Sequence, residues 1–325
     1  MQAILVREFG DAGVLRLAEV AAPVAGPGEV SVRVRAAGVN PYETLMRTGN
    51  YAIKPALPYI PGSDAAGEVL AVGAGVTRVT PGDRVYVYGT RDGLLGTYAE
   101  QVVCPEGRVF PLPDHVSFAQ GACLGVPYTT AYRALFHRAH AQPGETVLVH
   151  GATGAVGVAA VQLAHHHGLR VVGTGGTPGT LDTVRAQGAD VAVCHSAEGY
   201  REAIMAATGG RGVDLVLEMA AHINLDHDLQ MLAPHGRVVV IGNRGRVDID
   251  ARHTMNRDAA ILGMVVFNTP EDDVRSIHAA LTVGLANRTL NPIVREDLPL
   301  GEAARAHQLL ATLSSDAVGR VVLIP

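Results

Sequence analysis

Two patterns of hydrophobic and polar residues divide the chain into parts. Up to about residue 124, apolar and polar positions alternate in short runs that are separated by clusters of glycine and proline. Alternation with a period of two is typical of strands that bury one face. The pattern predicts a β-rich unit, either a small barrel or a strongly bent sheet. Its predicted strands lie at 2–9, 30–39, 65–72, 84–88 and 98–103.

From about residue 127, apolar runs alternate with helical segments. A helical stretch at 127–140 leads into six apolar runs, at 146–151, 169–174, 189–193, 213–219, 236–242 and 260–267. Because parallel strands need crossover connections and helices supply them, this alternation predicts a parallel sheet. Six strands are typical of a doubly wound, Rossmann-type dinucleotide-binding domain. We expect the sixth strand to end at a sheet edge.

The last part of the chain contains two predicted helices, at 270–286 and 301–312, and a final strand at 319–325. By element count this segment completes the N-terminal unit, which would then be discontinuous in sequence. We therefore expect a substrate-binding β-rich unit at 1–124, a dinucleotide-binding domain at 125–268, and a return segment at 269–325.

The dipeptide Asn40-Pro41 follows the second predicted strand, in which Val30, Val32 and Val34 alternate with polar residues. Asparagine tolerates unusual backbone angles and proline presets one, so the pair predicts a turn. This turn would place the following residues at the end of a strand that enters the interior.

Composition narrows the function classes. The chain of 325 residues carries a net charge of -5, which provides no basic surface for nucleic acid or anionic lipid, so nucleic-acid binding is not expected. No apolar run reaches the length of a membrane span, and the first residues do not resemble a signal peptide. Three widely spaced cysteines predict neither a disulfide framework nor a zinc ribbon. We expect buried thiols in a reducing cytoplasm.

A glycine-rich loop carries the strongest local chemistry. Gly151, Gly154 and Gly157 directly follow an apolar strand and directly precede an alanine-rich helix. Glycines permit the tight turn, a close approach of the backbone to a pyrophosphate, and packing of helix on sheet. Free N–H groups at the helix N-terminus then favour the anion. The loop predicts a bound dinucleotide.

The second strand of this domain favours NADP(H) over NAD(H). An NAD site usually carries an acid about 20 residues after the glycine loop. Here the strand ends without one, and the first acid is Asp182. Without that acid, a 2′-phosphate meets no repulsion. The sequence leaves open which cation would bind the 2′-phosphate. Arg185 lies away from the end of the second strand, and His195 is either the cationic partner or a histidine of a surface loop.

Six stretches of the sequence together resemble the zinc-free, ζ-crystallin-type quinone oxidoreductases of the medium-chain dehydrogenase/reductase superfamily. They occur in order along nearly the whole chain, at 38–51, 57–73, 125–135, 147–157, 217–230 and 236–245. The resemblance implies an α/β fold, with a six-stranded Rossmann sheet and a second, β-rich GroES-like barrel domain. It also implies reduction of quinones by NADPH.

The resemblance also bears on zinc. In zinc alcohol dehydrogenases of this superfamily, the position resembling Asn40 is a cysteine ligand, and the stretch resembling Gly62-Ser63-Asp64 is Gly-His-Glu. A catalytic zinc needs three such ligands and an open position. The four-cysteine lobe of those relatives is missing too, so we expect no zinc. The run 165–167 of three histidines should face solvent at a helix end.

A quinone suits a site without a Lewis acid, because its conjugated carbonyls stabilise the incoming electrons. By resemblance, Asn40 and Tyr51 lie near the nicotinamide and hydrogen-bond a quinone oxygen or the cofactor, and Thr130 meets the nicotinamide face. Two of these residues also have an ordinary structural interpretation: Tyr51 as an aromatic residue packed in a loop, and Thr130 as a residue at the start of a helix.

The cofactor contacts of the family fall on further positions of this sequence. The pyrophosphate loop corresponds to Thr153, Gly154, Ala155 and Val156, and the adenosine phosphate site to Gly176 and His195. The remaining contacts correspond to Asn224, Ile241, Gly242, Asn243, Met264, Val265 and Val266. Thr-Gly-Ala-Val replaces the common Ser-Gly-Gly-Val, a mild change because backbone N–H groups bind the phosphate. A basic residue that some relatives place after the second strand is absent.

Two other functions remain open at this stage. One is reduction of activated carbon–carbon double bonds by NADPH, as in related alkenal and enone reductases. The other is a non-catalytic crystallin-like or RNA-binding role, which the net charge of -5 disfavours. An apolar sixth strand at a sheet edge invites pairing with a second copy, so we expect a homodimer, with a tetramer as the alternative.

Overall fold

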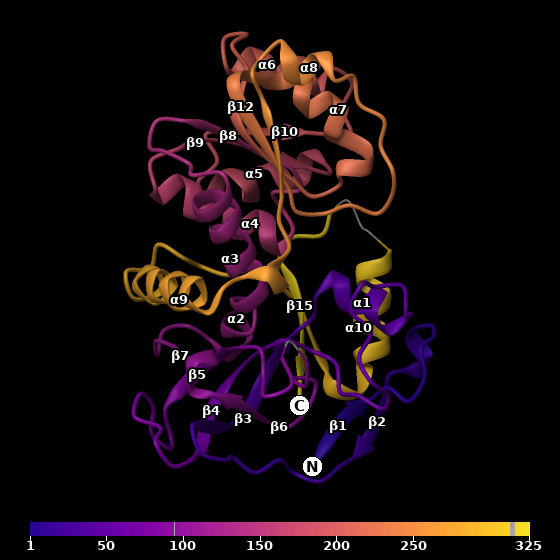
Figure 1. Ribbon diagram of the computed structural model, residues 1–325, viewed down its shortest axis with the longest axis vertical. Coiled ribbons are helices and arrows are strands. Elements are labelled where there is room, and N and C mark those ends of the chain that lie inside the picture. The colour runs from indigo at the N-terminus through magenta and orange to yellow at the C-terminus, as the bar shows by residue number, and fades with distance from the viewer. Residues whose placement is uncertain (94, 313–315) are drawn as a thin grey trace. The chain divides into compact units, whose positions relative to one another are not determined.

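The chain forms two compact units, drawn in Figure 1. The computed structural model describes residues 1–93, 95–312 and 316–325. The first unit contains Met1–Val126 and most of the chain from His278 onward, and the second contains Pro127–Ile277. The sequence-based boundary of 125 differs from this division by two residues, and that of 269 differs by nine.

The first unit is built on a seven-stranded sheet. Along its main path lie β14 (Val294–Pro299), β15 (Arg320–Ile324), β3 (Glu29–Gly38), β4 (Asp64–Val72), β5 (Arg84–Tyr88) and β7 (Val109–Pro111), and β6 (Gln101–Pro105) pairs with β3. A separate pair joins β1 (Gln2–Leu5) to β2 (Arg16–Glu19). The predicted β-rich unit is confirmed, whereas β2, β7 and β14 were not predicted.

The C-terminal strand lies inside the N-terminal sheet. In β15, Val322 pairs antiparallel with Gly38 of β3, and Leu323 pairs with Ala37. On β3, Val30, Val32 and Val34 are at most 3% exposed, as their alternation predicts. Because β15 borders β3, residues from the two ends of the chain meet where β3 ends.

Short helices cover parts of this unit. They are α1 (Pro41–Arg47), α2 (Phe118–Gly121), α10 (Ala303–Ala311) and the 3₁₀ turns Ala12–Val14, Glu106–Arg108 and Leu300–Glu302. Asn40 is the N-cap of α1 and Pro41 its first residue. The predicted turn is therefore the start of a helix, which proline favours because its missing N–H would have had no helical partner.

The second unit contains a six-stranded, fully parallel sheet. Its order is β10 (Val191–Cys194), β9 (Arg170–Gly175), β8 (Thr146–Val149), β11 (Val213–Glu218), β12 (Leu232–Val240) and β13 (Ala260–Gly263). In chain order this is 3-2-1-4-5-6, the doubly wound arrangement predicted from the sequence. β13 is an edge strand, also as predicted.

Helices cover both faces of this sheet, with α4 and α5 on one side and α6, α7 and α8 on the other in Figure 1. Their bounds are α4 (Ala155–His166), α5 (Pro178–Ala186), α6 (Tyr200–Ala207), α7 (Ala221–Met231) and α8 (Arg252–Met255), and α3 (Gly125–Tyr132) and α9 (Glu271–Ala286) flank the unit in sequence. The three histidines at the end of α4 are exposed, as predicted.

Two local predictions need correction. The sixth strand ends at Gly263, and Val266–Asn268 form a 3₁₀ turn, although the apolar run continues to 267. After α3 the chain continues as a π-helix, Arg133–Arg138. An apolar run indicates that residues are buried, and residues of a turn can be buried as well as residues of a strand. The run alone therefore could not show where β13 ends.

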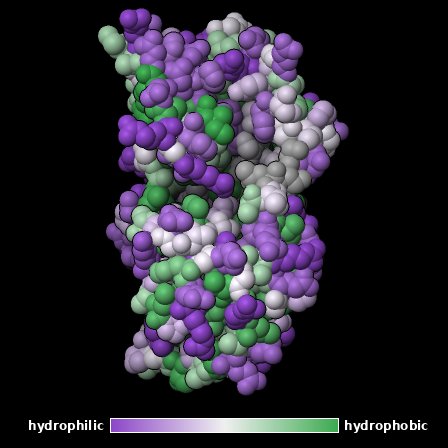
Figure 2. Space-filling model, turned by 90° about the vertical axis from the view of Figure 1, so that its right-hand side faces the viewer, coloured by the Kyte–Doolittle hydropathy of each residue, from purple (hydrophilic) through white to green (hydrophobic). Residues whose placement is uncertain are grey.

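Polar side chains predominate on the face drawn in Figure 2, where apolar residues form separate patches. No helix within the described residues combines the length and the apolar character needed to cross a membrane. Cys104 and Cys123 are buried as expected, but Cys194 is partly exposed.

Candidate functional site

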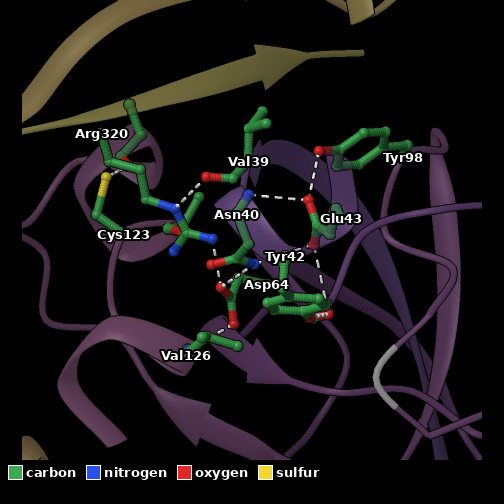
Figure 3. Close-up of polar contacts among 12 residues, drawn as sticks. Val39, Asn40, Tyr42, Glu43, Asp64, Tyr98, Cys123, Val126 and Arg320 are labelled. Atoms are coloured by element: carbon green, nitrogen blue, oxygen red, sulfur yellow. Dashed lines mark hydrogen bonds and ion pairs between the residues drawn. The ribbon is translucent and has the colours of Figure 1, made fainter. Parts of the chain in front are cut away.

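The first unit holds a buried polar network around Asn40, at the junction of β3 and α1 (Figure 3). Asn40 is 2% exposed. Its backbone N–H donates to Glu43 Oε2 at 2.9 Å, and its Nδ2 donates to Glu43 Oε1 at 3.0 Å and to Asp64 Oδ2 at 3.1 Å. Both N–H groups of the amide are thus used inside the protein.

Glu43 is the centre of this network. Its carboxyl is 2% exposed and also accepts from Tyr98 Oη at 2.6 Å and Ser63 Oγ at 3.4 Å. Burial raises the pKa of Glu43, and the hydrogen bonds from Tyr98 and Asn40 oppose that rise because they favour the ionised form. Tyr42 completes the network through a hydroxyl contact with Ser63.

An ion pair between Asp64 and Arg320 closes the other side of the network (Figure 3). The Arg320 side chain is 2% exposed and that of Asp64 is fully buried. Arg320 Nε donates to Val39 O at 3.1 Å, and Nη1 donates to Ala122 O at 3.0 Å. Asp64 Oδ1 accepts from the Val126 N–H at 2.8 Å.

The residues at this position do not fit a zinc ion. The resemblance predicts two zinc-ligand positions at Asn40 and Ser63, and an amide and a hydroxyl are poor zinc ligands compared with cysteine and histidine. Asp64 already faces a guanidinium cation, and Glu43 already accepts four hydrogen bonds. The network is therefore satisfied by the protein's own donors.

Tyr51 and Thr130 lie in different units. Tyr51 follows α1 and is half-buried, with its ring centroid 5.8 Å from that of Tyr42, and burial raises the pKa of its phenol. Thr130 lies in α3 and is 5% exposed, in the middle of the helix and not at its start. Their contacts with a substrate or cofactor stay predictions.

The glycine loop of the second unit has the geometry of a phosphate cradle. Gly151 has a φ of +59°, in the left-handed region that favours glycine. Gly154 is the N-cap of α4, and Ala155 and Val156 are its first residues. A Cβ on Gly157 would lie 2.1 Å from Gly151 O, so only glycine fits there. Thr153 lies between these glycines and is partly exposed.

The end of β9 lies beside the end of β10. The His195 N–H donates to Gly175 O at 3.0 Å, which joins the two strand ends through their backbones. Ser196 Oγ donates to Gly176 O at 2.8 Å. The two positions predicted for the adenosine phosphate site, Gly176 and His195, therefore lie at the same edge of the sheet.

The two candidate cations near this edge differ in their surroundings. His195 is exposed as a residue, whereas Arg185 pairs with Asp182 at 2.9 Å. Partial burial of its ring and the neighbouring His150 lower the pKa of His195. Of the two, His195 lies at the strand end, and its contact with a 2′-phosphate stays a prediction.

The later predicted contacts gather where β11 and β12 end. Asn224 Nδ2 donates to Glu218 Oε1 at 3.3 Å, and the N–H groups of Ile241 and Gly242 donate to Glu218 O at 2.9 and 3.1 Å. Asn243 Nδ2 donates to Gly245 O at 2.8 Å. After β13, Met264 and Val266 are 8% exposed and Val265 is 41% exposed.

One cluster, formed by His150, Glu218 and Asp228, was not predicted from the sequence, and we call it the buried triad. One nitrogen or oxygen atom of each side chain lies within 4.8 Å of the other two. His150 directly precedes Gly151, and Glu218 ends β11, the neighbour of β8. A polar residue at the ends of two adjacent parallel strands was the available signal, because such ends share one edge of the sheet.

Comparison with known proteins agrees with this architecture. Residues 26–114 match the family model "Alcohol dehydrogenase GroES-like domain", and residues 155–282 match "Zinc-binding dehydrogenase". The quinone oxidoreductase of Rattus norvegicus is 42% identical over 325 residues, which are 100% of this chain and 98% of the relative.

Solved structures show the same similarity over the whole chain. The quinone oxidoreductase of Escherichia coli complexed with NADPH has a TM-score of 0.88 and 27% identity, with 100% of both chains covered. An NAD-dependent alcohol dehydrogenase has a TM-score of 0.92 and 30% identity, again with 100% of both chains covered. The predicted resemblance is confirmed: the chain belongs to the quinone oxidoreductase family of the medium-chain dehydrogenase/reductase superfamily.

Proposed function

We propose that this protein reduces quinones with NADPH and without zinc. The observation that carries the proposal is the closed network at Asn40, in which Asp64 is paired with Arg320 and no strong zinc ligand stands at the described positions 40 and 63. A site of this kind suits an acceptor that needs no Lewis acid. The full-length similarity to quinone oxidoreductases supports the choice of acceptor.

NADPH supplies the hydride when it is bound, and the protein supplies position and charge. In our proposal the backbone N–H groups from Thr153 to Val156 bind the pyrophosphate at the start of α4. The end of β9 carries no acid that would repel a 2′-phosphate, and His195 lies next to it. The carbonyl of Asn40 and the phenol of Tyr51 orient the quinone or the nicotinamide.

We further propose a cytoplasmic homodimer. Ile261 on the edge strand β13 is 40% exposed, and among the described strands β13 pairs with β12 alone. An apolar edge strand can pair with the same strand of a second copy. Sedimentation equilibrium tests this proposal, and a monomer at micromolar concentration would contradict it.

A panel assay tests the function. Oxidation of NADPH and NADH is followed with ortho- and para-quinones, enones and alcohols, and the metal content of the same preparation is measured. We expect turnover of quinones with NADPH preferred and no stoichiometric zinc. Faster reduction of enones than of quinones would replace the proposed activity, and one zinc per chain would refute the argument from the network.

A further inference from the structure

The buried triad adjoins the glycine loop through His150. His150 separates β8 from Gly151, Glu218 is the last residue of β11, and Asp228 lies in α7. Glu218 and Asp228 are fully buried, and His150 is 5% exposed. His150 Nε2 lies 2.8 Å from Asp228 Oδ1 and 3.6 Å from Glu218 Oε2.

The hydrogen bonds of the triad identify a missing proton donor. His150 Nε2 faces both acids, so the proton of the neutral ring belongs on this nitrogen, from which it is donated to Asp228 Oδ1. As carboxylates, Asp228 Oδ2 and Glu218 Oε2 are then buried without a hydrogen-bond donor. Two unsatisfied anionic oxygens are costly in a protein interior. The side chains of Glu218 and Asp228 lie in hydrogen-bond contact, so one proton on Glu218, donated to Asp228, would place a donor between the two acids.

Neighbouring groups do not supply a compensating cation. Among the described residues, His150 is the ion-pair partner of both acids. Arg237 on β12 is paired with Glu145 at 2.7 Å, and Arg201 on α6 contacts His227 of α7. Other titratable groups on the surrounding elements are the phenol of Tyr200, the ring of His195, the Asp226 carboxyl on α7 and the His253 ring on α8.

The triad also holds the backbone that the cofactor is proposed to contact. Glu218 Oε1 accepts from the Ala220 N–H and from Asn224 Nδ2, and Glu218 O accepts from the N–H groups of Ile241 and Gly242. A change in the charge or position of Glu218 therefore reaches the loops after β11 and β12 directly.

We propose that Glu218 and Asp228 share one proton near the glycine loop, and that this proton keeps the site receptive to the phosphates of NADPH. Both acids are positioning residues in this scheme, because they act through the loops. When the proton leaves as the pH rises past neutrality, a second negative charge arises near an anion-binding loop and weakens NADPH binding. The inference rests on the proposed use of NADPH, and it adds that the protonation of the two acids controls the charge near the phosphate-binding loop.

The first measurement is independent of the cofactor. Infrared difference spectra between Glu218→Gln and the wild-type protein at pH 6 should contain the carbonyl band of a protonated carboxyl group in the wild type. The absence of that wild-type band from the difference spectra against both Glu218→Gln and Asp228→Asn would overturn the shared proton. One equivalent of a divalent metal that is lost in Asp228→Asn would also overturn it, and would assign the triad to a metal.

The second measurement is the dissociation constant of NADPH between pH 6 and pH 9. In the wild type it should rise on the order of tenfold, as expected for one added charge at an effective dielectric constant of about 20. Glu218→Gln keeps a neutral hydrogen-bond donor, so it should retain the pH 6 affinity and lose most of the rise. Glu218→Ala lacks the donor and the acceptor, and should bind NADPH more weakly at every pH.

Glu202→Gln on α6 is the matched control, because it removes an exposed carboxylate from the same unit. The dissociation constant of NADPH for Glu202→Gln should depend on pH as it does for the wild type. Titration of the NADPH phosphate and of His195 affects all variants alike, so it does not distinguish them. A wild-type slope in Glu218→Gln would refute the role of the proton. Failure of every variant and of the wild type to bind NADPH would instead refute the proposed function, while the infrared result would still stand.

Discussion

Replacement of Arg320 by methionine is the sharpest test of the buried network around Asn40. The guanidinium is the cationic partner of Asp64 and also donates to the carbonyls of Val39 and Ala122. In Arg320→Met the Asp64 carboxylate, which is fully buried, keeps hydrogen bonds only from Val126 and Asn40. Removing one partner of a buried pair typically costs about 3–5 kcal/mol, because the other charge stays buried without compensation.

Urea-induced unfolding provides the assay. The chain has no tryptophan and nine tyrosines, so far-UV circular dichroism and tyrosine fluorescence are suitable probes. We expect Arg320→Met to lower the free energy of unfolding by about 3–5 kcal/mol. The double variant Asp64→Asn with Arg320→Met should recover part of this loss, because it leaves no unpaired charge.

Arg305→Met is the matched control. Its guanidinium pairs with Glu296 and Glu302 on the surface, so its removal should leave the unfolding midpoint unchanged. A loss below about 1 kcal/mol in Arg320→Met, or no recovery in the double variant, would refute the view that Arg320 compensates a buried charge.

Three other variants test the remaining steps. Tyr51→Phe should lower kcat for quinone reduction more than it changes the Kd of NADPH, and unchanged kinetics would leave Tyr51 with a packing role alone. Gly157→Ala should abolish NADPH binding because the new Cβ would lie 2.1 Å from Gly151 O, whereas Gly179→Ala, which has room for a Cβ, should bind normally; equal affinities would contradict the close-packed loop. Burial raises the pKa of Glu218 from 4.5 to about 7, so the stability from its protonated form is full below pH 4.5 and is lost as the pH rises toward 7. Glu218→Gln should remove that decline, about 3 kcal/mol at most, from the stability profile measured by urea unfolding, and an unchanged profile would contradict the raised pKa.

Local patterns predicted much of the fold. The alternation up to Val34 identified β3, and strand–helix alternation identified the parallel sheet, because each element has its own period of burial. The pattern failed for β14, where Arg295, Glu296 and Asp297 form a polar run at the sheet edge. An edge strand has one neighbouring strand and does not need to alternate.

The glycine loop, the amide and hydroxyl side chains at positions 40 and 63, and the missing acid after β9 could all be identified from the sequence, because each depends on residue type at a local position. How the buried charges are compensated depends on the tertiary structure. Arg320 reaches Asp64 across 256 residues, and His150 reaches Asp228 across 78. The first contact exists because β15 inserts beside β3, and the second because α7 packs on the end of β11. Such pairings follow from topology, which brings together residues that no spacing along the chain connects.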